Sequence, residues 1–372
     1  MTKEEYRIAI HDVIYLAACA VNGDIPEAEK VQKMDLACVL QAAKTHQLTS
    51  VADAALQAVG VRDEQFFQET AKAQRKTALM DFDRERLFSC LEREAIWYMP
   101  LKGCVLKDMY PRFGMRQMAD NDILIDPERA ADVKDIMENL GFTTKQFGAG
   151  VHDIYYKMPV SNFEIHTGLF APSYKPALYM YYRDIKPRLV KDEGNQYGYQ
   201  FNEEDLYIYM VAHEYKHYSG GGTGLRSFLD AYVYMLKYGD SLDWSYIQAE
   251  MRKLGISEFE KQSRSFALHL FGKATLTEKE MAMLEYVTWS GAFGTTAHRT
   301  DNRVKELGGG LKGTARYIKN RLFIPMESVK EHYSVFYNHK ILLPFLPFWR
   351  IGKGLAINRK TIRSEIHSLM KK

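Results

Sequence analysis

The sequence predicts an α+β protein, with a small mixed sheet and helical regions before and after it in the chain. Two observations lead to this fold class. Residues 1–92 and 201–302 carry apolar side chains at three- and four-residue spacings, the pattern of helices with one buried face. Residues 93–200 instead contain short aliphatic and aromatic runs between turns and short helices. This mixture indicates an α/β core of about 100 residues.

The N-terminal elements follow from periodicity and helix signals. Apolar residues between Tyr6 and Ala17 predict the first helix, and Pro26 suits the first turn of the next. Periodic stretches follow at 35–47 and 50–59. A long helix is expected over 63–93, which contains neither Gly nor Pro.

The core and the region after it are placed by short apolar runs and by glycine or proline boundaries. In the core we expect helices at 104–109 and 128–140, and strands at 95–99, 120–125, 142–147, 151–158 and 163–167. Helices return over 203–218 and 225–238, with further helix starts near Leu242 and Thr275 and glycine-rich breaks at 219–224 and 308–310.

Length and charge suggest the domain organisation. The 372 residues are enough for two or three domains. We divide the chain into an N-terminal helical region (1–92), the α/β core (93–200), a helical domain that closes a cleft (201–302) and a basic helical segment (303–372). The last segment has 15 Lys and Arg against 4 Asp and Glu. It suits contact with an anionic surface or partner, or a solvated helical surface.

Composition excludes several classes of protein. With 46% hydrophobic and 26% charged residues the chain is typical of soluble globular proteins. Its four cysteines form no Cys-x-x-Cys pair, so neither a disulfide framework nor a zinc ribbon is indicated, and we expect a reducing, cytoplasmic location. The apolar runs 13–21 and 341–349 are too short to span a bilayer, and the first lacks a basic leader, so we expect no transmembrane segment and no signal peptide. The second run could touch a membrane interface or pack as a connector.

Two carboxylates at the start of one strand are the strongest functional signal. Asp120 and Asp122 precede the apolar run Ile123-Leu124-Ile125. Acidic residues are poor strand formers, so local propensity does not explain the pair. Residues i and i+2 of a strand point to the same face, so both acids could hold one or two hard cations, with Glu164 of a later strand as the natural third carboxylate.

This arrangement fits the transfer of phosphoryl and nucleotidyl groups. Such reactions need divalent cations that neutralise the triphosphate, and carboxylates that fix those cations. Gly103 would let the backbone approach a phosphate, and the helix after it would present its N–H groups. Lys102 and Arg116 would supply positive charge to the phosphates.

The pattern resembles an uncharacterised bacterial nucleotidyltransferase family of the DNA polymerase β-like superfamily. The resemblance covers about residues 95–170 and rests on Leu101-Lys102-Gly103, Tyr110-Pro111, Arg116, Asp120-x-Asp122 and Phe163-Glu164-Ile165-His166. It implies transfer of a nucleotidyl group from an NTP, with Mg²⁺ or Mn²⁺ held by Asp120, Asp122 and Glu164, and with Glu164 helping to activate the nucleophile. Where the superfamily usually has a serine after the glycine, this chain has Cys104.

A weaker part of the resemblance lies in the later helices, at His213, His217, Arg226 and Asp230. These four, together with Lys102, Gly103, Arg116 and His166, are the predicted nucleotide-binding residues. Arg226 and Asp230 are also spaced for an i,i+4 ion pair, so a purely structural network is an alternative. The acceptor stays open among a small molecule, a glycan precursor, RNA and a protein.

Two alternative functions remain at this point. The first is a catalytically silent module on the same fold that binds a nucleotide or a partner. The second is a zinc peptidase, because His213-Glu214-Tyr215-Lys216-His217 is an H-E-x-x-H sequence whose histidines share a helix face. The position where the extended motif has a third histidine is Thr223, so a more distant ligand such as Asp230 or Glu250 would be needed.

Overall fold

The computed structural model describes residues 1–326, 329–330, 333–357 and 359–370. Within it the chain forms two compact units. The first contains Met1–Glu214 and Gly224–Thr288, and the second contains Tyr215–Thr223 and Trp289–Lys372.

The first unit begins with five helices, as the periodicity predicts. They are α1 (Lys3–Asn22), α2 (Ala28–Gln32), α3 (Leu36–His46), α4 (Thr49–Ala58) and α5 (Glu64–Arg93). Local signals set their ends. Thr2 and Glu5 form a capping box at the start of α1, and Gly23 ends that helix with a φ of 75°. Asp63 caps α5 by accepting bonds from the amides of Gln65 and Phe66.

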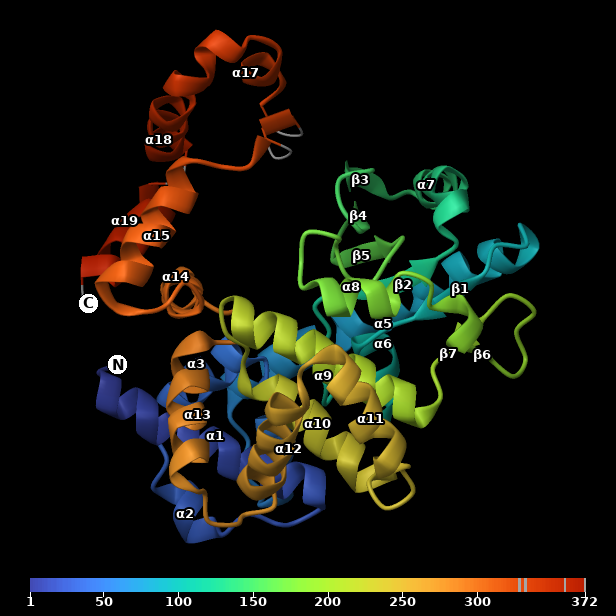
Figure 1. Ribbon diagram of the computed structural model, residues 1–372. Helices are drawn as coiled ribbons and strands as arrows, with labels where there is room; N and C mark the ends of the chain where they lie inside the picture. The colour runs from blue at the N-terminus through green and yellow to red at the C-terminus, as the bar shows by residue number, and fades with distance from the viewer. Residues whose placement is uncertain (327–328, 331–332, 358, 371–372) are drawn as a thin grey trace. The chain divides into compact units, whose positions relative to one another are not determined.

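A five-stranded mixed sheet follows, so the predicted α+β class is confirmed (Figure 1). Its strands are β1 (Tyr98–Pro100), β2 (Asn121–Ile125), β3 (Thr143–Gln146), β4 (His152–Lys157) and β5 (Ser161–His166). The spatial order is β1-β2-β5-β4-β3. β2 runs parallel to β5, and the other neighbours pair antiparallel. Between β1 and β2 lie α6 (Gly103–Leu106) and a 3₁₀ turn at Lys107–Met109; a second 3₁₀ turn, Pro127–Arg129, leads into α7 (Ala130–Asn139).

One face of this sheet is an apolar core packed against helices. Ile123 and Ile125 of β2 and Phe163 and Ile165 of β5 lie in one buried cluster with residues of α5 and α7. Because successive strand residues point to opposite faces, Asp122 and Glu164 lie on the other face of the sheet. The core therefore fixes which face carries the acids.

Helices dominate again after the sheet. They are α8 (Pro176–Tyr182), α9 (Glu203–Gly220), α10 (Leu225–Tyr238), α11 (Trp244–Leu254), α12 (Ser257–Phe271) and α13 (Glu278–Ser290). A 3₁₀ turn, Lys186–Arg188, and a two-stranded ribbon, β6 (Val190–Lys191) with β7 (Tyr199–Gln200), lie between α8 and α9. The sequence patterns did not predict α8 or this ribbon.

The second unit carries the basic segment. Its elements after α13 are α14 (Thr296–Glu306), α15 (Gly310–Leu322), α17 (Ser334–Asn338), a 3₁₀ stretch at Lys340–Phe345, α18 (Leu346–Ile357) and α19 (Arg359–Met370). Ser368 on α19 bonds Asp301 on α14 at 2.7 Å. Two basic residues of this segment, Lys371 and Lys372, lie outside the described residues.

The apolar run at 341–349 is not a core-packing connector along its whole length. Leu346 is buried, but Ile341, Phe345 and Phe348 are exposed. Among the residues that the structure describes, no helix combines the length and the apolar character needed to cross a membrane. All four cysteines are free thiols.

Several predicted elements differ from the structure at their ends, and two of these differences have a clear local cause. The strand expected at 95–99 begins only at Tyr98, because Ala95 takes a φ of 54° in the turn that ends α5 and the Ile96 amide bonds Leu91 O. The break expected at 308–310 is shorter than predicted, because Gly310 is already the first residue of α15.

Candidate functional site

The polar face of the sheet is organised by strand register. Asp122 pairs with Glu164 across the parallel β2–β5 ladder, and Glu164 pairs with Ile154 across the antiparallel β4–β5 ladder. Residues directly opposite each other point to the same face, and so do residues two apart on one strand. His152, Ile154 and Tyr156 of β4 therefore share this face with Asn162, Glu164 and His166 of β5.

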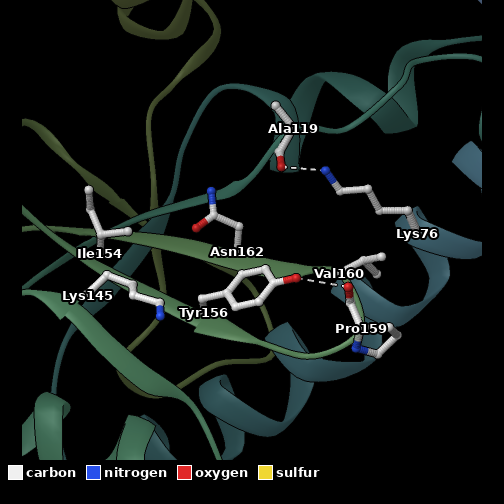
Figure 2. A pocket seen from close by; sticks show the side chains of 8 residues that line it. All are labelled: Lys76, Ala119, Lys145, Ile154, Tyr156, Pro159, Val160 and Asn162. Carbon is white, nitrogen blue, oxygen red and sulfur yellow. Dashed lines mark hydrogen bonds between the residues drawn. The ribbon is translucent and has the colours of Figure 1, made fainter. Parts of the chain in front are cut away.

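At one end of this face lies a cavity of about 520 Å³. Figure 2 shows the Tyr156 ring among its lining side chains, with Lys76 and Lys145 on different sides of it. The lining residues are Lys76, Ala119, Lys145, Ile154, Tyr156, Pro159, Val160 and Asn162. The Tyr156 hydroxyl donates to Pro159 O at 3.0 Å, and Lys76 Nζ donates to Ala119 O at 2.7 Å.

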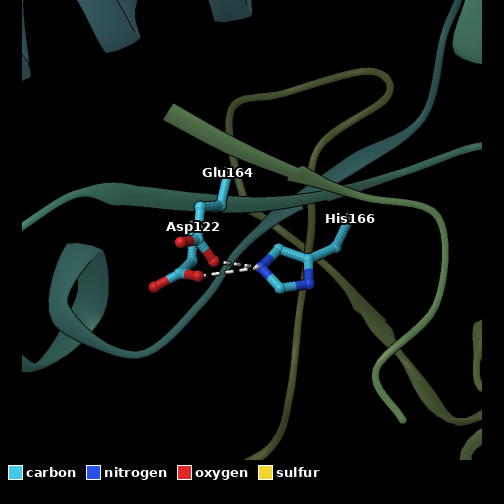
Figure 3. Close-up of side chains that lie close together, drawn as sticks. All are labelled: Asp122, Glu164 and His166. Carbon is cyan, nitrogen blue, oxygen red and sulfur yellow. Dashed lines mark hydrogen bonds and ion pairs between the residues drawn. The ribbon is translucent and has the colours of Figure 1, made fainter. Parts of the chain in front are cut away.

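Further along the face, two carboxylates and an imidazole converge (Figure 3). One ligand atom each from Asp122, Glu164 and His166 lies within 4.8 Å of the others, and this is the only such group of three or more among the described residues. His166 Nε2 is 2.8 Å from Asp122 Oδ1 and 3.8 Å from Glu164 Oε2. His166 comes two residues after Glu164 on the same strand, so the two side chains share one face.

Lys102 completes the charge balance of this cluster. Its Nζ lies 2.8 Å from Asp122 Oδ1. Burial by itself would raise the pKa of Asp122, but the Lys102 ammonium and the hydrogen bond to His166 hold that pKa well below its usual range. Asp122 is therefore ionised at neutral pH. Lys102 has φ 46° and ψ −117°, a conformation that costs free energy for a residue with a Cβ.

Asp120 lies just before β2 and outside the converging group of three. Burial and the neighbouring charge of Asp122 raise the pKa of Asp120, while Lys102, Arg226 and Lys76 act against that rise. The structure thus brings two of the three predicted metal carboxylates together and adds His166. It places three cationic side chains around the remaining carboxylate.

The turn at Lys102-Gly103 differs from the predicted phosphate cradle. The α6 helix has only four residues, and the amides of three of them are already used: Cys104 N donates to Leu101 O, and Val105 N and Leu106 N donate to Lys102 O. A Cβ on Gly103 would lie 2.6 Å from Arg116 Nη1. Gly103 is therefore needed for the packing of Arg116. The Cys104 thiol points into the core, 3.3 Å from Asn121 Oδ1, so it does not replace a serine at a phosphate.

Arg116 is committed to a buried ion pair. Its Nε and Nη2 lie 2.7 and 2.8 Å from the two oxygens of Asp230 on α10, and the Tyr110 hydroxyl donates to Asp230 Oδ1 at 2.8 Å. Desolvation alone would lower the pKa of Arg116, but the Asp230 carboxylate raises it above its ordinary value. The pair joins the loop before β2 to α10, a positional role that differs from the phosphate contact expected for Arg116.

Arg226 does not form the i,i+4 pair with Asp230 that its spacing suggests. Its Nη1 donates to Gln47 Oε1 and to Gln117 O, the latter at 3.2 Å. Desolvation lowers the pKa of Arg226, and the nearby Asp120 acts in the opposite direction. Arg226, like Lys102, is therefore a predicted cation that lies near the carboxylate pair.

The H-E-x-x-H sequence gains no zinc ligands from the fold. His213 and His217 belong to no group of three or more metal-binding side chains within the described ranges. Glu214 is buried, and Ser263 Oγ donates to it at 3.0 Å. The distant candidates are also engaged, since Asp230 pairs with Arg116, and Glu250 accepts a bond of 2.6 Å from the Tyr181 hydroxyl. The geometry does not support a peptidase.

Three residues near the site were not singled out from the sequence. Tyr209 of α9 is buried, and burial is the main reason why the pKa of its hydroxyl is raised. The charges of Lys102, Asp122 and Glu164 also affect this pKa, so the ring lies near the cluster. His152 Nε2 lies 3.8 Å from Glu164 Oε2. Lys76 lies near Asp120 from α5. The alternation along β4 could have placed His152 on this face, but nothing local marks Tyr209 or Lys76.

The donor set fits a divalent cation. Two carboxylates suit Mg²⁺ and Mn²⁺, and an imidazole nitrogen adds a ligand that Mn²⁺ accepts readily. The buried Nδ1 of His166 has no hydrogen-bond partner among the described residues.

Comparison with known families agrees with this geometry. The family model described as uncharacterised nucleotidyltransferase matches residues 32–272. The chain belongs to this uncharacterised nucleotidyltransferase family. The match includes every residue of the cluster and extends to α12, whereas the basic segment lies outside it. Neither the curated proteins nor the solved structures give a match.

Proposed function

We propose that the protein transfers a nucleotidyl group from an NTP to an acceptor in a reaction that requires Mg²⁺ or Mn²⁺. The observation that carries the proposal is the register of β2 and β5, which sets Asp122 beside Glu164 with His166 within 4.8 Å. A divalent cation at this cluster would neutralise triphosphate charge and orient the α-phosphate. The family supports transferase chemistry.

Each residue of the cluster has a distinct proposed role. Asp122 is the ionised cation ligand, and His166 fixes the orientation of its carboxylate through the 2.8 Å contact. Glu164 is partly exposed, with 26% of its side chain accessible, so it can both approach the cation and accept the proton of an acceptor hydroxyl. Asp120, on the same strand face as Asp122 by its spacing, is proposed as the further metal carboxylate.

The surrounding residues would bind and position the nucleotide. Lys102 and Arg226 are proposed to contact phosphates, because both act on the carboxylate pair and both carry positive charge. Gly103, Arg116 and Asp230 would hold the turn that carries Lys102. His213, which contacts the Tyr209 ring at a centroid distance of 6.0 Å, remains a proposed wall of the nucleotide site. His217 belongs to the second unit and is not assigned to this site.

The test is metal-dependent NTP binding and transfer. Each NTP would be titrated into the full chain with Mg²⁺, with Mn²⁺ and with EDTA. Transfer of label from an α-labelled NTP to small-molecule, RNA and protein fractions, with release of pyrophosphate, would then be measured. We expect Asp122→Asn and Glu164→Gln to lower transfer at least about 100-fold. Asp135→Asn, at an exposed carboxylate of α7, is the matched control.

Equal NTP binding with Mg²⁺ and with EDTA, unchanged in Asp122→Asn, would exclude the proposal. A second candidate, nucleotide binding without transfer, is favoured by one observation: the Lys102 ammonium already lies 2.8 Å from Asp122 Oδ1, where it can act as a permanent counter-ion. In that case NTP would bind, Lys102→Met would weaken binding, and no α-label would reach any acceptor fraction.

A further inference from the structure

The cavity beside the cluster lies on the side of Glu164 that faces away from Lys102. Across the sheet, Lys102 follows β1, Asp122 is on β2 and Glu164 is on β5. Half of the eight lining residues lie on strands of this sheet: Asn162 on β5, Ile154 and Tyr156 on β4, and Lys145 on β3 (Figure 2). Asn162 precedes Glu164 by two residues and Ile154 pairs with Glu164, so the cavity adjoins that carboxylate on the same face.

The order of Lys102, Asp122, Glu164 and the cavity across the sheet matches the geometry of nucleotidyl transfer. The attacking and leaving oxygens lie roughly in line on opposite sides of the phosphorus. If the triphosphate lies towards Lys102, the acceptor hydroxyl must approach from the side of Glu164 and of the cavity. Its oxygen bonds to the α-phosphorus while the bond to the α–β bridging oxygen breaks. Pyrophosphate leaves, and the hydroxyl proton passes to Glu164.

The lining of the cavity indicates which acceptor fits. None of its eight lining residues is acidic, and two are lysines. Lys76 Nζ donates to Ala119 O at 2.7 Å and already lies near the Asp120 carboxylate. Lys145 is exposed and has no ion-pair partner among the described residues. An amine without a paired carboxylate favours an anionic group. The Tyr156 ring and Ile154 supply apolar contact area, and the Asn162 amide supplies one donor and one acceptor group.

We infer that this cavity is the acceptor subsite and that the acceptor is a small hydroxyl compound carrying a phosphate monoester. The phosphate would lie at Lys145, and the carbon skeleton against Tyr156. The volume of about 520 Å³ admits a molecule of this size. This assignment rests on the proposed nucleotidyl transfer and names the class of its second substrate.

The experiment uses ribose 5-phosphate as the anionic probe and ribose as its neutral match. Each is titrated by ligand-observed NMR into the full chain with EDTA present, so that no cation-bound nucleotide contributes. Ribose 5-phosphate should bind at least about tenfold more tightly than ribose. Lys145→Glu should weaken that binding about tenfold, and Lys134→Glu, on α7 away from the cavity, should not. Because Lys145 is exposed, its reversal does not threaten folding. Lys145→Met, which removes the amine without adding a negative charge, is the second variant and should also weaken ribose 5-phosphate binding.

The outcomes separate this inference from the proposed function. Equal binding of ribose and ribose 5-phosphate, or equal effects of Lys145→Glu and Lys134→Glu, overturns the acceptor subsite. An equal loss of Mg²⁺-dependent NTP affinity in Lys145→Glu also overturns it, because the cavity would then hold the donor. If phosphate-dependent binding responds to Lys145→Glu but no NTP binds with Mg²⁺ or Mn²⁺, the anion site stands and nucleotidyl transfer fails.

Discussion

Glu214, the acid of the H-E-x-x-H sequence, should be protonated at neutral pH. Burial raises the pKa of Glu214 to about 8, from an ordinary value of 4.5. Its side chain is only 6% exposed, and its hydrogen-bond donor is the neutral hydroxyl of Ser263. A protonated carboxyl cannot act as a general base, so this ionisation state separates a structural role from a peptidase role.

Proton linkage turns the raised pKa into a measurable change in stability. Between pH 4.5 and about 8, the folded chain holds a proton that the unfolded chain has released. The free energy of unfolding therefore falls as the pH rises through this window, by about 1.4 kcal/mol per pH unit. Below the window both states are protonated, and above it neither is. The total change is of the order of 4–5 kcal/mol.

Comparison with Glu214→Gln isolates this effect from other titrating groups. Urea unfolding of both proteins at pH 5, 6, 7 and 8 should show the variant gaining stability relative to wild type by about 1.4 kcal/mol per unit. Glu258→Gln, at an exposed position on α12, should show no such trend. In ¹³C NMR of labelled glutamate, the signal absent from Glu214→Gln should titrate near pH 8. A midpoint near 4.5, or parallel pH profiles for wild type and Glu214→Gln, would refute the argument.

Two further predictions concern how the Lys102 turn is held. Gly103→Ala places a Cβ 2.6 Å from Arg116 Nη1, so we expect about 1–3 kcal/mol lower stability in urea unfolding. Gly220→Ala, where nothing lies within 4 Å of the new Cβ, is the control, and equal losses would contradict the packing argument. Asp230→Ala leaves the buried Arg116 unpaired and should cost about 3–5 kcal/mol, but much less in an Arg116→Met background. Equal costs in both backgrounds would show that the pair is not coupled.

The sequence predicts the fold well where local patterns and tertiary structure agree. The helices at 1–92 have periodic apolar faces and capping residues, so their existence and type follow directly. The strand β2 is likewise marked by the apolar run Ile123-Leu124-Ile125, and β5 by the alternation of Phe163 and Ile165 with polar residues. The strand β1 is shorter than its sequence predicts. Residues 95–97 precede the strand because the turn after α5 includes Ala95, although Ile96 and Trp97 have strand propensity.

The site is predicted less completely, because its contacts join residues far apart in the chain. The strand alternation and the resemblance both favour Asp122 and Glu164 on one face. They cannot show that Asp230 pairs with Arg116, 114 residues away, when Arg226 lies only one helical turn from it. They also cannot show that Gly103 serves Arg116. Side-chain partners of this kind depend on how α10 packs against the loop before β2.

The parallel pairing of β2 with β5 has a consequence for variation in chain length. Asp122 and Glu164 face the same side of the sheet because they pair directly across the β2–β5 ladder. One residue inserted within β5 ahead of Glu164 would shift its pairing by one position and turn that acid into the core beside α5 and α7. Insertions in the exposed loop at 147–150 leave the pairing intact. Length differences among family members should therefore collect in that loop, while the two strands keep a constant length.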